Sequence, residues 1–173
     1  MEFNIRKAAV EDAQSIASVQ VDTWRTTYAG IVPEAFLNSL NAGERAEDWK
    51  EHLQAGDTLA FVAQGQSGIF GFICGGRLRE AIGAYDGELY AIYLRPEGQR
   101  RGVGRGLVRS LAEALRIEGF KSMAVWVLER NLSAVSFYLR LGGIQVAQKT
   151  IEIGGAELSD LALGWANLES FLK

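Results

Sequence analysis

Residues Leu94–Gly104, with the sequence LRPEGQRRGVG, connect a predicted strand to a strongly amphipathic predicted helix. The strand is expected over Glu88–Leu94, an aromatic and β-branched run after which Pro96 cannot continue a ladder of backbone hydrogen bonds. The helix is expected over Gly104–Glu118, where apolar residues recur at helical spacing and Gly119 supplies a C-terminal stop. The stretch therefore predicts a sharp passage from a strand into a helix N-terminus.

This connection has the composition of a phosphate-binding loop. Gly102 and Gly104 let the backbone turn tightly and approach a ligand closely, and the free N–H groups at the helix start favour an anion. Arg100 and Arg101 add positive charge. The glycines do not follow the spacing G-x-G-x-x-G, and no Gly-Lys-Ser/Thr follows, so neither a Rossmann fingerprint nor a Walker loop is present. A glycine-rich turn with solvated arginines is the alternative that this motif alone leaves open.

Outward from the loop, the hydrophobic period alternates between helical and strand-like. Apolar residues at helical spacing predict helices, and alternating or continuous apolar runs predict strands. The expected elements are a strand Phe3–Lys7; helices Val10–Trp24, Pro33–Leu40 and Glu44–Leu53; strands over 58–64, 69–78 and 121–128; a helix capped by Asn131 and ending at Leu141; and a hairpin of 144–153 with 156–165. This order predicts one α/β domain over residues 1–173, with a mixed sheet and helices on both of its faces.

Composition limits the class of protein. The 173 residues suit one domain, and 48% hydrophobic with 23% charged residues is typical of a packed globular protein. A net charge of −3 argues against nucleic acid as the main partner, since phosphate binding needs a basic surface. No apolar run is long enough for a membrane span, and the first residues lack a signal-peptide core. We therefore expect no membrane partner and a cytoplasmic location.

The chain has one cysteine, Cys74, and one histidine, His52. An internal disulfide is impossible and a zinc site built from Cys and His is excluded. A metal site built from carboxylates is the alternative left open, but no motif indicates one, so no metal is expected. A thiol–imidazole pair is not expected either. Cys74 falls in a buried-type strand, where it serves as a small apolar filler, and His52 falls in a charged helical segment.

A second motif follows the loop. Asn131–Tyr138, with the sequence NLSAVSFY, precedes Leu141-Gly142. Together with Gln99–Gly104 (QRRGVG), placed after Ile92–Glu97, it resembles the GCN5-related N-acetyltransferase (GNAT) family, whose signatures are R/Q-x-x-G-x-G/A and N-x-x-A-x-x-F/L-Y…L-G. The two motifs cover Glu88–Gly143 in the order of that family. The resemblance implies a GNAT-type domain with a mostly antiparallel, twisted central sheet.

The resemblance also implies acetyl-CoA as co-substrate and indicates which residues hold it. The backbone of Ile92, Tyr93 and Leu94 would pair with the pantetheine arm like an added strand, and one N–H there would polarise the thioester carbonyl. Asn131 would contact the pantetheine or cysteamine end, and Tyr138 would lie near the sulfur. The pyrophosphate would bind the loop made of Gln99, Arg100, Arg101, Gly102, Val103, Gly104 and Arg105.

Amide formation from an amine and a thioester needs two proton transfers. The acceptor amine, with a pKa of about 10.4, is protonated at neutral pH and must lose a proton before it attacks. The departing thiolate, with a pKa of about 8.5, leaves more easily when a hydroxyl such as that of Tyr138 protonates it. No covalent enzyme intermediate is needed, since holding both reactants together supplies much of the rate. Because Tyr138 shares a helical face with Ala134 and Leu141, a plain core tyrosine is the alternative for it.

The base is expected to be Glu88, acting through a water molecule, because this residue begins the strand that leads to the thioester. Some members of the family that the chain resembles have a glutamate on the next strand, where this chain has Trp126, which does not titrate. Glu129, Glu34 and Asp86 are the other candidates. For each carboxylate the alternative is a solvated surface position.

The acceptor side is less constrained. Trp24 and Tyr28 precede the irregular stretch Ala29–Val32 and are the aromatic pair expected to line a substrate pocket, with burial in the core as the alternative. The expected reaction is acyl transfer, by default of acetyl, to a primary amine of a small molecule or peptide in a ternary complex. A non-catalytic acyl-CoA sensor and a nucleotide-binding protein unrelated to CoA are the competing interpretations. The terminal hairpin is the expected surface of a possible homodimer.

Overall fold

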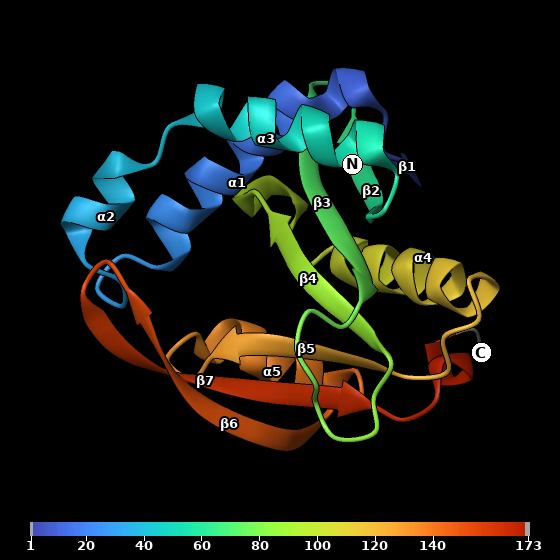
Figure 1. The fold of residues 1–173 in the computed structure, drawn as a ribbon. Helices are drawn as coiled ribbons and strands as arrows, with labels where there is room; N and C mark the ends of the chain where they lie inside the picture. Colours follow the sequence, from blue (N-terminus) through green and yellow to red (C-terminus); the bar gives the residue numbers. More distant parts are fainter. Residues whose placement is uncertain (1, 172–173) are drawn as a thin grey trace.

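A computed structural model describes residues 2–171. Its seven strands form one sheet in the order β1-β2-β3-β4-β5-β7-β6 (Figure 1). Between β4 and β5 the pairing is parallel, and between the other neighbours it is antiparallel. The strands are β1 Asn4–Lys7, β2 Leu59–Gly65, β3 Gly68–Arg77, β4 Gly87–Leu94, β5 Met123–Leu128, β6 Ile144–Ile153 and β7 Ala156–Trp165. The predicted α/β fold with a mixed, mostly antiparallel sheet is confirmed.

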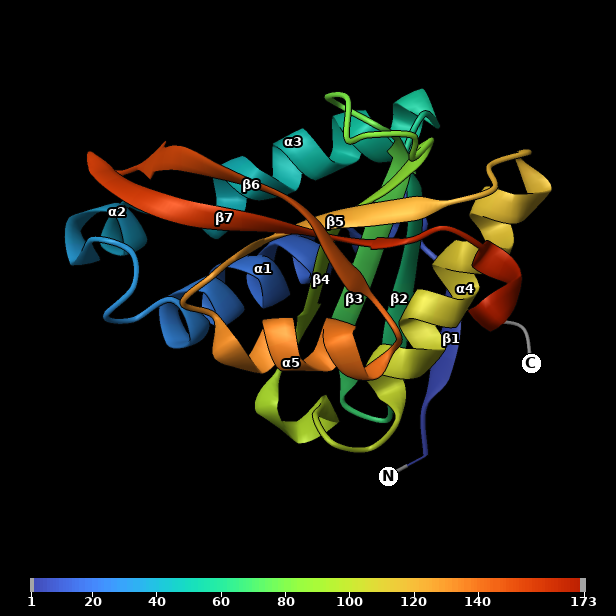
Figure 2. The ribbon, with the colours of Figure 1, turned by 90° about the horizontal axis from the view of Figure 1, so that it is seen from below.

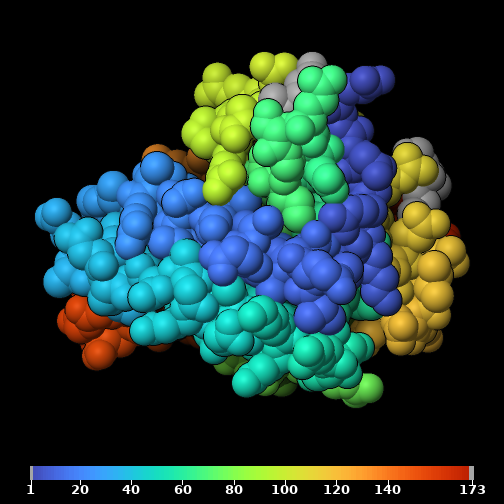
Figure 3. Space-filling view, turned by 90° about the horizontal axis from the view of Figure 1, so that it is seen from above, coloured from blue at the N-terminus to red at the C-terminus, as the bar shows by residue number. Residues whose placement is uncertain are grey.

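Helices cover both faces of this sheet (Figures 1 and 2). On one face, α1 (Ala13–Thr27) packs on β3 and β4, and α3 (Ala42–Ala55) packs on α1 (Figure 3). On the other face, α4 (Val103–Ile117) lies across β1 to β4, and α5 (Leu132–Arg140) lies beside β5. The short α2 (Glu34–Ser39) meets the turn of the β6–β7 hairpin. The described residues also form 3-10 turns at Val10–Asp12, Pro96–Gly98 and Leu168–Phe171, of which only the first lies within a predicted helix.

The apolar stripe predicted on α4 forms the centre of the larger core. All five of its residues have no exposed surface, and they pack against inward-facing residues of β3, β4 and β5. Full burial of a leucine contributes about 1.5–3 kcal/mol, so this stripe alone fixes α4 firmly on the sheet. The stripe consists of Leu107, Val108, Leu111, Ala112 and Leu115. The helix start, which carries the predicted phosphate-binding loop, is thereby held in place.

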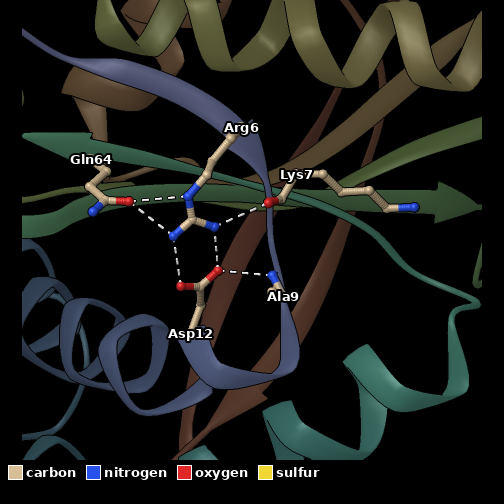
Figure 4. Close-up of polar contacts among 5 residues, drawn as sticks. All are labelled: Arg6, Lys7, Ala9, Asp12 and Gln64. Carbon is tan, nitrogen blue, oxygen red and sulfur yellow. Dashed lines mark hydrogen bonds and ion pairs between the residues drawn. The ribbon is translucent and has the colours of Figure 1, made fainter.

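An ion pair between the partly exposed Arg6 and the buried Asp12 ties β1 to the start of α1 (Figure 4). Asp12 is 8% exposed and accepts two hydrogen bonds from the Arg6 guanidinium, of 2.6 and 2.9 Å, and one of 2.8 Å from the Ala9 N–H. The same guanidinium donates to the side-chain oxygen of Gln64 on β2. The hydrogen bond from Arg6 is the main reason that the pKa of the Asp12 carboxyl lies below its usual value of 3.8.

We expect Asp12→Ala to lower the free energy of unfolding by about 2 kcal/mol at neutral pH, because hydrogen bonds to charged groups contribute about 1.5–3 kcal/mol. The pKa of Asp12 is lowered in the folded state, so its contribution is complete above the unfolded pKa and is lost as the pH falls through the folded pKa. Denaturant titrations of both proteins from neutral to acidic pH measure this difference. Equal stabilities at neutral pH would contradict the prediction.

Candidate active site

The sheet opens where β4 and β5 separate (Figures 1 and 2). β4 pairs with β5 only over Gly87–Leu89, against Met123–Val125. At the next residue, Tyr90, the register of β4 with β3 shifts by one, which marks a β-bulge. Gly75 of β3 makes room there, since a Cβ on it would lie 2.4 Å from the Glu88 carbonyl oxygen. A bulge bends its strand and increases the local twist, and this accounts for the turn of β4 away from β5.

The separation leaves one edge of Ile92–Leu94 without a strand partner. β3 pairs with the opposite edge, through Gly71–Ile73. The N–H and C=O groups on a free edge can hydrogen-bond to an added extended chain. The structure therefore leaves Ile92, Tyr93 and Leu94, all partly buried, with a free backbone edge to which an extended chain could hydrogen-bond.

The loop after β4 presents a row of backbone N–H groups. Within residues 2–171, no hydrogen-bond acceptor is found for the N–H groups of residues 100–105, whereas the Gly106 N–H bonds to the Gly102 carbonyl at 3.0 Å. Arg100 and Gly102 are in the left-handed region, with φ of 56° and 81°. That conformation costs a residue with a side chain about 1–2 kcal/mol, so Arg100 is held in a strained position. N–H groups gathered at a helix N-terminus form an anion-binding site.

The side chains of the loop hold it in place and supply charge. The Gln99 side-chain amide donates a hydrogen bond of 3.0 Å to the Leu94 carbonyl, which closes the loop onto the end of β4. Arg100, Arg101 and Arg105 are exposed and form no ion pair with another residue of the described chain. Their charges are therefore available to a bound anion.

Val103 and Gly104 are buried and set the start of α4 against α5. A Cβ on Gly104 would lie 3.2 Å from the Phe137 ring and 3.5 Å from the Leu94 side chain. The sequence suggested that Gly104 allows close approach of a ligand. The structure adds a second reason for the glycine, which is close packing between the end of β4, α4 and α5.

α5 supplies the two residues expected at the thioester end. Asn131 caps the helix, because its side-chain oxygen accepts a hydrogen bond of 3.2 Å from the Ala134 N–H. Tyr138 is 4% exposed, and its ring centroid lies 6.0 Å from that of Trp165. None of the hydrogen bonds found within residues 2–171 involves the Tyr138 hydroxyl. Burial raises the pKa of Tyr138 far above its usual 10.0, so this hydroxyl stays protonated at neutral pH.

Aromatic residues connect α1 to the open edge of β4. The Trp24 indole N–H donates a hydrogen bond of 2.8 Å to the Tyr93 hydroxyl, and the ring centroid of Tyr28 lies 4.7 Å from that of Trp24. Burial raises the pKa of Tyr28, and the neighbouring polar side chains of Tyr93 and Asn131 oppose that rise. Tyr28 in turn raises the pKa of Tyr138. The expected substrate pair, Trp24 and Tyr28, thus lies beside the residues expected at the thioester.

Glu88, the expected base, is fully buried at the closed end of the separation between β4 and β5, opposite Ala124. Both of its carboxylate oxygens are engaged by Arg79. One accepts a hydrogen bond of 2.9 Å from the Arg79 backbone N–H, and the other accepts from the guanidinium, at 3.0 Å from Nε. This geometry suits a residue that fixes the segment after β3, and it leaves Glu88 poorly placed to take a proton directly.

The other carboxylates named from the sequence have different positions. Asp86 accepts hydrogen bonds from the Lys121 N–H and from the N–H and hydroxyl of Ser122, so it fixes the start of β5. Glu34 and Glu129 are exposed. Sequence reasoning missed Asp160 on β7, which is 7% exposed. The signal that could have found it is a single charge within the largely apolar run from residue 158 to 165.

Cys74 lies in a buried cluster with Trp49 and Phe72. Burial raises the pKa of its thiol to about 12, so it carries no thiolate nucleophile at neutral pH. Within residues 2–171, no group of three or more His, Cys, Asp or Glu side chains is arranged to hold a metal ion. The helices of the same part of the chain are too short or too polar to span a bilayer.

Comparison with known proteins finds similar acetyltransferases. Residues 68–151 match a family model described as FR47-like protein. An uncharacterized N-acetyltransferase of Bacillus subtilis, YuaI, is 46% identical over 167 residues, which cover 96% of this chain and 94% of that protein. The spermidine N(1)-acetyltransferase of Thermoplasma acidophilum is 26% identical over 82% of this chain and 88% of that protein.

Two solved structures with bound coenzyme share the fold. The PaiA N-acetyltransferase of Thermoplasma acidophilum, in complex with coenzyme A, has a TM-score of 0.71 and 25% identity, and the match covers 93% of this chain and 98% of that one. YncA of Salmonella typhimurium, with acetyl-CoA, has a TM-score of 0.72 and 19% identity over 96% and 94% of the two chains. Fold and relatives together define an acetyltransferase. The chain belongs to the GCN5-related N-acetyltransferase family, as its two motifs predicted, and its co-substrate is acetyl-CoA.

Proposed function

We propose that the protein transfers an acetyl group from acetyl-CoA to a primary amine of a small molecule or peptide, by direct attack within a ternary complex. The observation that carries this proposal is the proximity of three features. The free edge of Ile92–Leu94, the N–H groups of residues 100–105 and the helix that bears Tyr138 adjoin one another, because Gly104 packs against both Leu94 and Phe137.

In this proposal each feature has one role. The free edge of β4 holds the pantetheine arm and orients the thioester, and the loop holds the pyrophosphate. Tyr138 gives a proton to the leaving thiolate, for which its raised pKa keeps the hydroxyl protonated. Asn131 contacts the cysteamine end. Glu88 either accepts a proton through a water molecule or only fixes the position of Arg79.

The acceptor is proposed to be cationic and to enter beside Trp24 and Tyr28. Rings of this kind attract an ammonium group through their faces. The relative named as a spermidine N(1)-acetyltransferase supports a polyamine as the first acceptor to test. Peptide N-termini and lysine side chains are also proposed acceptors, since each presents a primary amine.

The test is a measurement of thiol release from acetyl-CoA with a panel of amines that includes spermidine, lysine and a short peptide. We expect release that depends on the amine. Thermal shift provides the matching binding test, because a ligand at 100 times its Kd stabilises a fold by about 2.7 kcal/mol. CoA should raise the melting temperature, whereas ATP and NAD at equal concentration should not.

A non-catalytic acyl-CoA sensor is the second candidate function. The specific observation in its favour is that both oxygens of Glu88 are engaged by Arg79, while Trp126 occupies the next strand. The sensor predicts stabilisation by CoA without thiol release for any amine in the panel. Stabilisation by ATP or NAD as strong as that by CoA would contradict both candidates.

We also propose that the protein associates as a homodimer through the terminal hairpin. Edge strand β6 exposes Ile144 and Val146, at 62% and 36%, and Leu139 of α5 is 49% exposed. Exposed apolar residues on an edge strand favour pairing with another chain. Light scattering measures the mass in solution, and a monomer at all concentrations would contradict this assembly.

A further inference from the structure

Asp160 lies at the open end of the separation between β4 and β5. It pairs in register with Leu128, the last residue of β5, whereas β5 stops pairing with β4 at Val125. Alternate residues of a strand face the same side, so Asp160 shares a face with Ala162. Trp126 is the register partner of Ala162, which places Asp160 and Trp126 as diagonal neighbours on one face.

Asp160 is a buried residue whose carboxylate has no partner within the described chain, and its oxygens still reach solvent, since they are not among the fully enclosed polar atoms without a hydrogen bond. Its exposed fraction is 7%, and no hydrogen bond or ion pair to it is found within residues 2–171. Its cross-strand neighbour Lys149 is engaged elsewhere, because its Nζ lies 4.0 Å from the centroid of the Trp126 ring and pairs with Glu80. The other nearby cation, Arg79, is held by Glu88. An unpaired carboxylate that is partly removed from water and still open on one side is suited to receive a cation from outside the chain.

The electrostatic surroundings agree with such a role. Burial raises the pKa of Asp160 to about 6, while Lys149 and Arg79 lower it and Glu80 raises it. Leu128, the register partner of Asp160, packs in one cluster with Tyr28 and Trp24, so Asp160 lies near the aromatic pair expected to line the acceptor pocket. A carboxylate that titrates near neutral pH is well matched to accept a proton there.

We propose that Asp160 receives the ammonium group of the acceptor and removes its first proton. This inference rests on the proposed function. An N–H bond of the ammonium group breaks and an O–H bond forms on Asp160, which frees the nitrogen lone pair to attack the thioester carbon. As the C–N bond forms and the C–S bond breaks, Tyr138 protonates the thiolate and regains a proton from the nitrogen. Asp160 then releases its proton to solvent, so one proton is released for each amide formed.

Asp160→Asn is the deciding variant, because it keeps the shape of the side chain and removes its charge. In calorimetry with the CoA-bound protein, we expect the affinity for spermidine to fall at least about 10-fold, as for loss of a hydrogen bond to a charged group. We expect kcat/KM at neutral pH to fall about 100-fold, as for loss of a general base. The wild-type protein should lose kcat/KM as the pH falls through about 6, and the variant should lack this acidic limb.

Stability separates this role from a structural one. The pKa of Asp160 is raised in the folded state, so the charged form destabilises the fold above that pKa, and Asp160→Asn should not lower the melting temperature at neutral pH. If Lys149 instead pairs with Asp160 in solution, Asp160→Asn and Lys149→Met would lower it equally. Glu157→Gln, an exposed carboxylate change on the same strand, is the matched control and should leave every measurement unchanged.

Unchanged spermidine affinity in Asp160→Asn, or no binding of any amine by the wild-type protein, would overturn the proposed role of Asp160. An acidic limb that persists in the variant would also overturn it. If the wild-type protein binds spermidine through Asp160 but releases no thiol with any amine, the proposed transferase function fails and the binding site stands.

Discussion

Replacing Tyr138 with Phe is expected to lower kcat about 100-fold, in the range for loss of a general acid, and to leave the affinity for CoA unchanged. The ring of Tyr138 is buried against Trp165 and would keep its packing as phenylalanine. Its hydroxyl makes no hydrogen bond within residues 2–171, so its removal leaves no polar group unsatisfied. The change therefore tests the proton alone. Thiol-release kinetics give kcat, and calorimetry gives the Kd of CoA.

Tyr85→Phe is the matched control for this substitution. Tyr85 packs over Gly164 on the sheet face opposite to Tyr138, so the same atom is removed away from the thioester. We expect kcat of this control to equal that of the wild-type protein. A second signature is pH dependence: because the pKa of Tyr138 is raised, wild-type kcat should show no loss from its ionisation up to pH 10. An unchanged kcat in Tyr138→Phe would remove Tyr138 from the acid role.

The elements that the sequence predicted well are those with a local physical cause. The buried stripe of α4 follows from spacing alone, and the helix was predicted over Gly104–Glu118 and observed over Val103–Ile117. Asn131 begins α5 and Gly119 follows the end of α4. Each acts within one turn of its own helix, so these two helix ends could also be predicted from the sequence. The conformation of the loop before α4 belongs to this group, since its glycines and the helix start are adjacent in the chain, and its phosphate-binding role stays a prediction.

The surroundings of the candidate bases could not be predicted in the same way, because they depend on contacts between distant strands. Glu88 has the expected place in the sequence, but a bulge at Tyr90 and the guanidinium of Arg79 decide what its carboxylate touches. Asp160 comes 32 residues after Leu128 in the chain and yet lies opposite it in the sheet. Whether the Asp160 carboxylate is free depends on which cations pair with it. Lys149 pairs instead with Glu80, a residue far away in the sequence, and the sequence alone does not show this.

Gly104→Val is expected to weaken CoA binding about 100-fold. A Cβ at this position would already lie 3.2 Å from the Phe137 ring, and the two methyl groups of valine extend further. Either α5 or the start of α4 must therefore shift, and the start of α4 carries the N–H groups of residues 100–105. A hydrogen bond to a charged group contributes about 1.5–3 kcal/mol, so the loss of one or two of them accounts for a change of this size.

Two further variants separate loss of the anion site from loss of stability. Gly119→Ala changes a left-handed glycine (φ 93°) just after the other end of α4, so it strains the backbone without touching the loop. It should lower the melting temperature and keep the wild-type Kd for CoA. Gly104→Ala adds only the Cβ atom and should give an intermediate Kd, which preserves the test if the valine variant does not fold. A folded Gly104→Val protein that binds CoA as tightly as the wild type would show that the start of α4 does not hold the pyrophosphate. The free edge of Ile92–Leu94 and the arginines would then have to account for the affinity, which is why the backbone variant tests the site more directly than removal of Arg100 or Arg101.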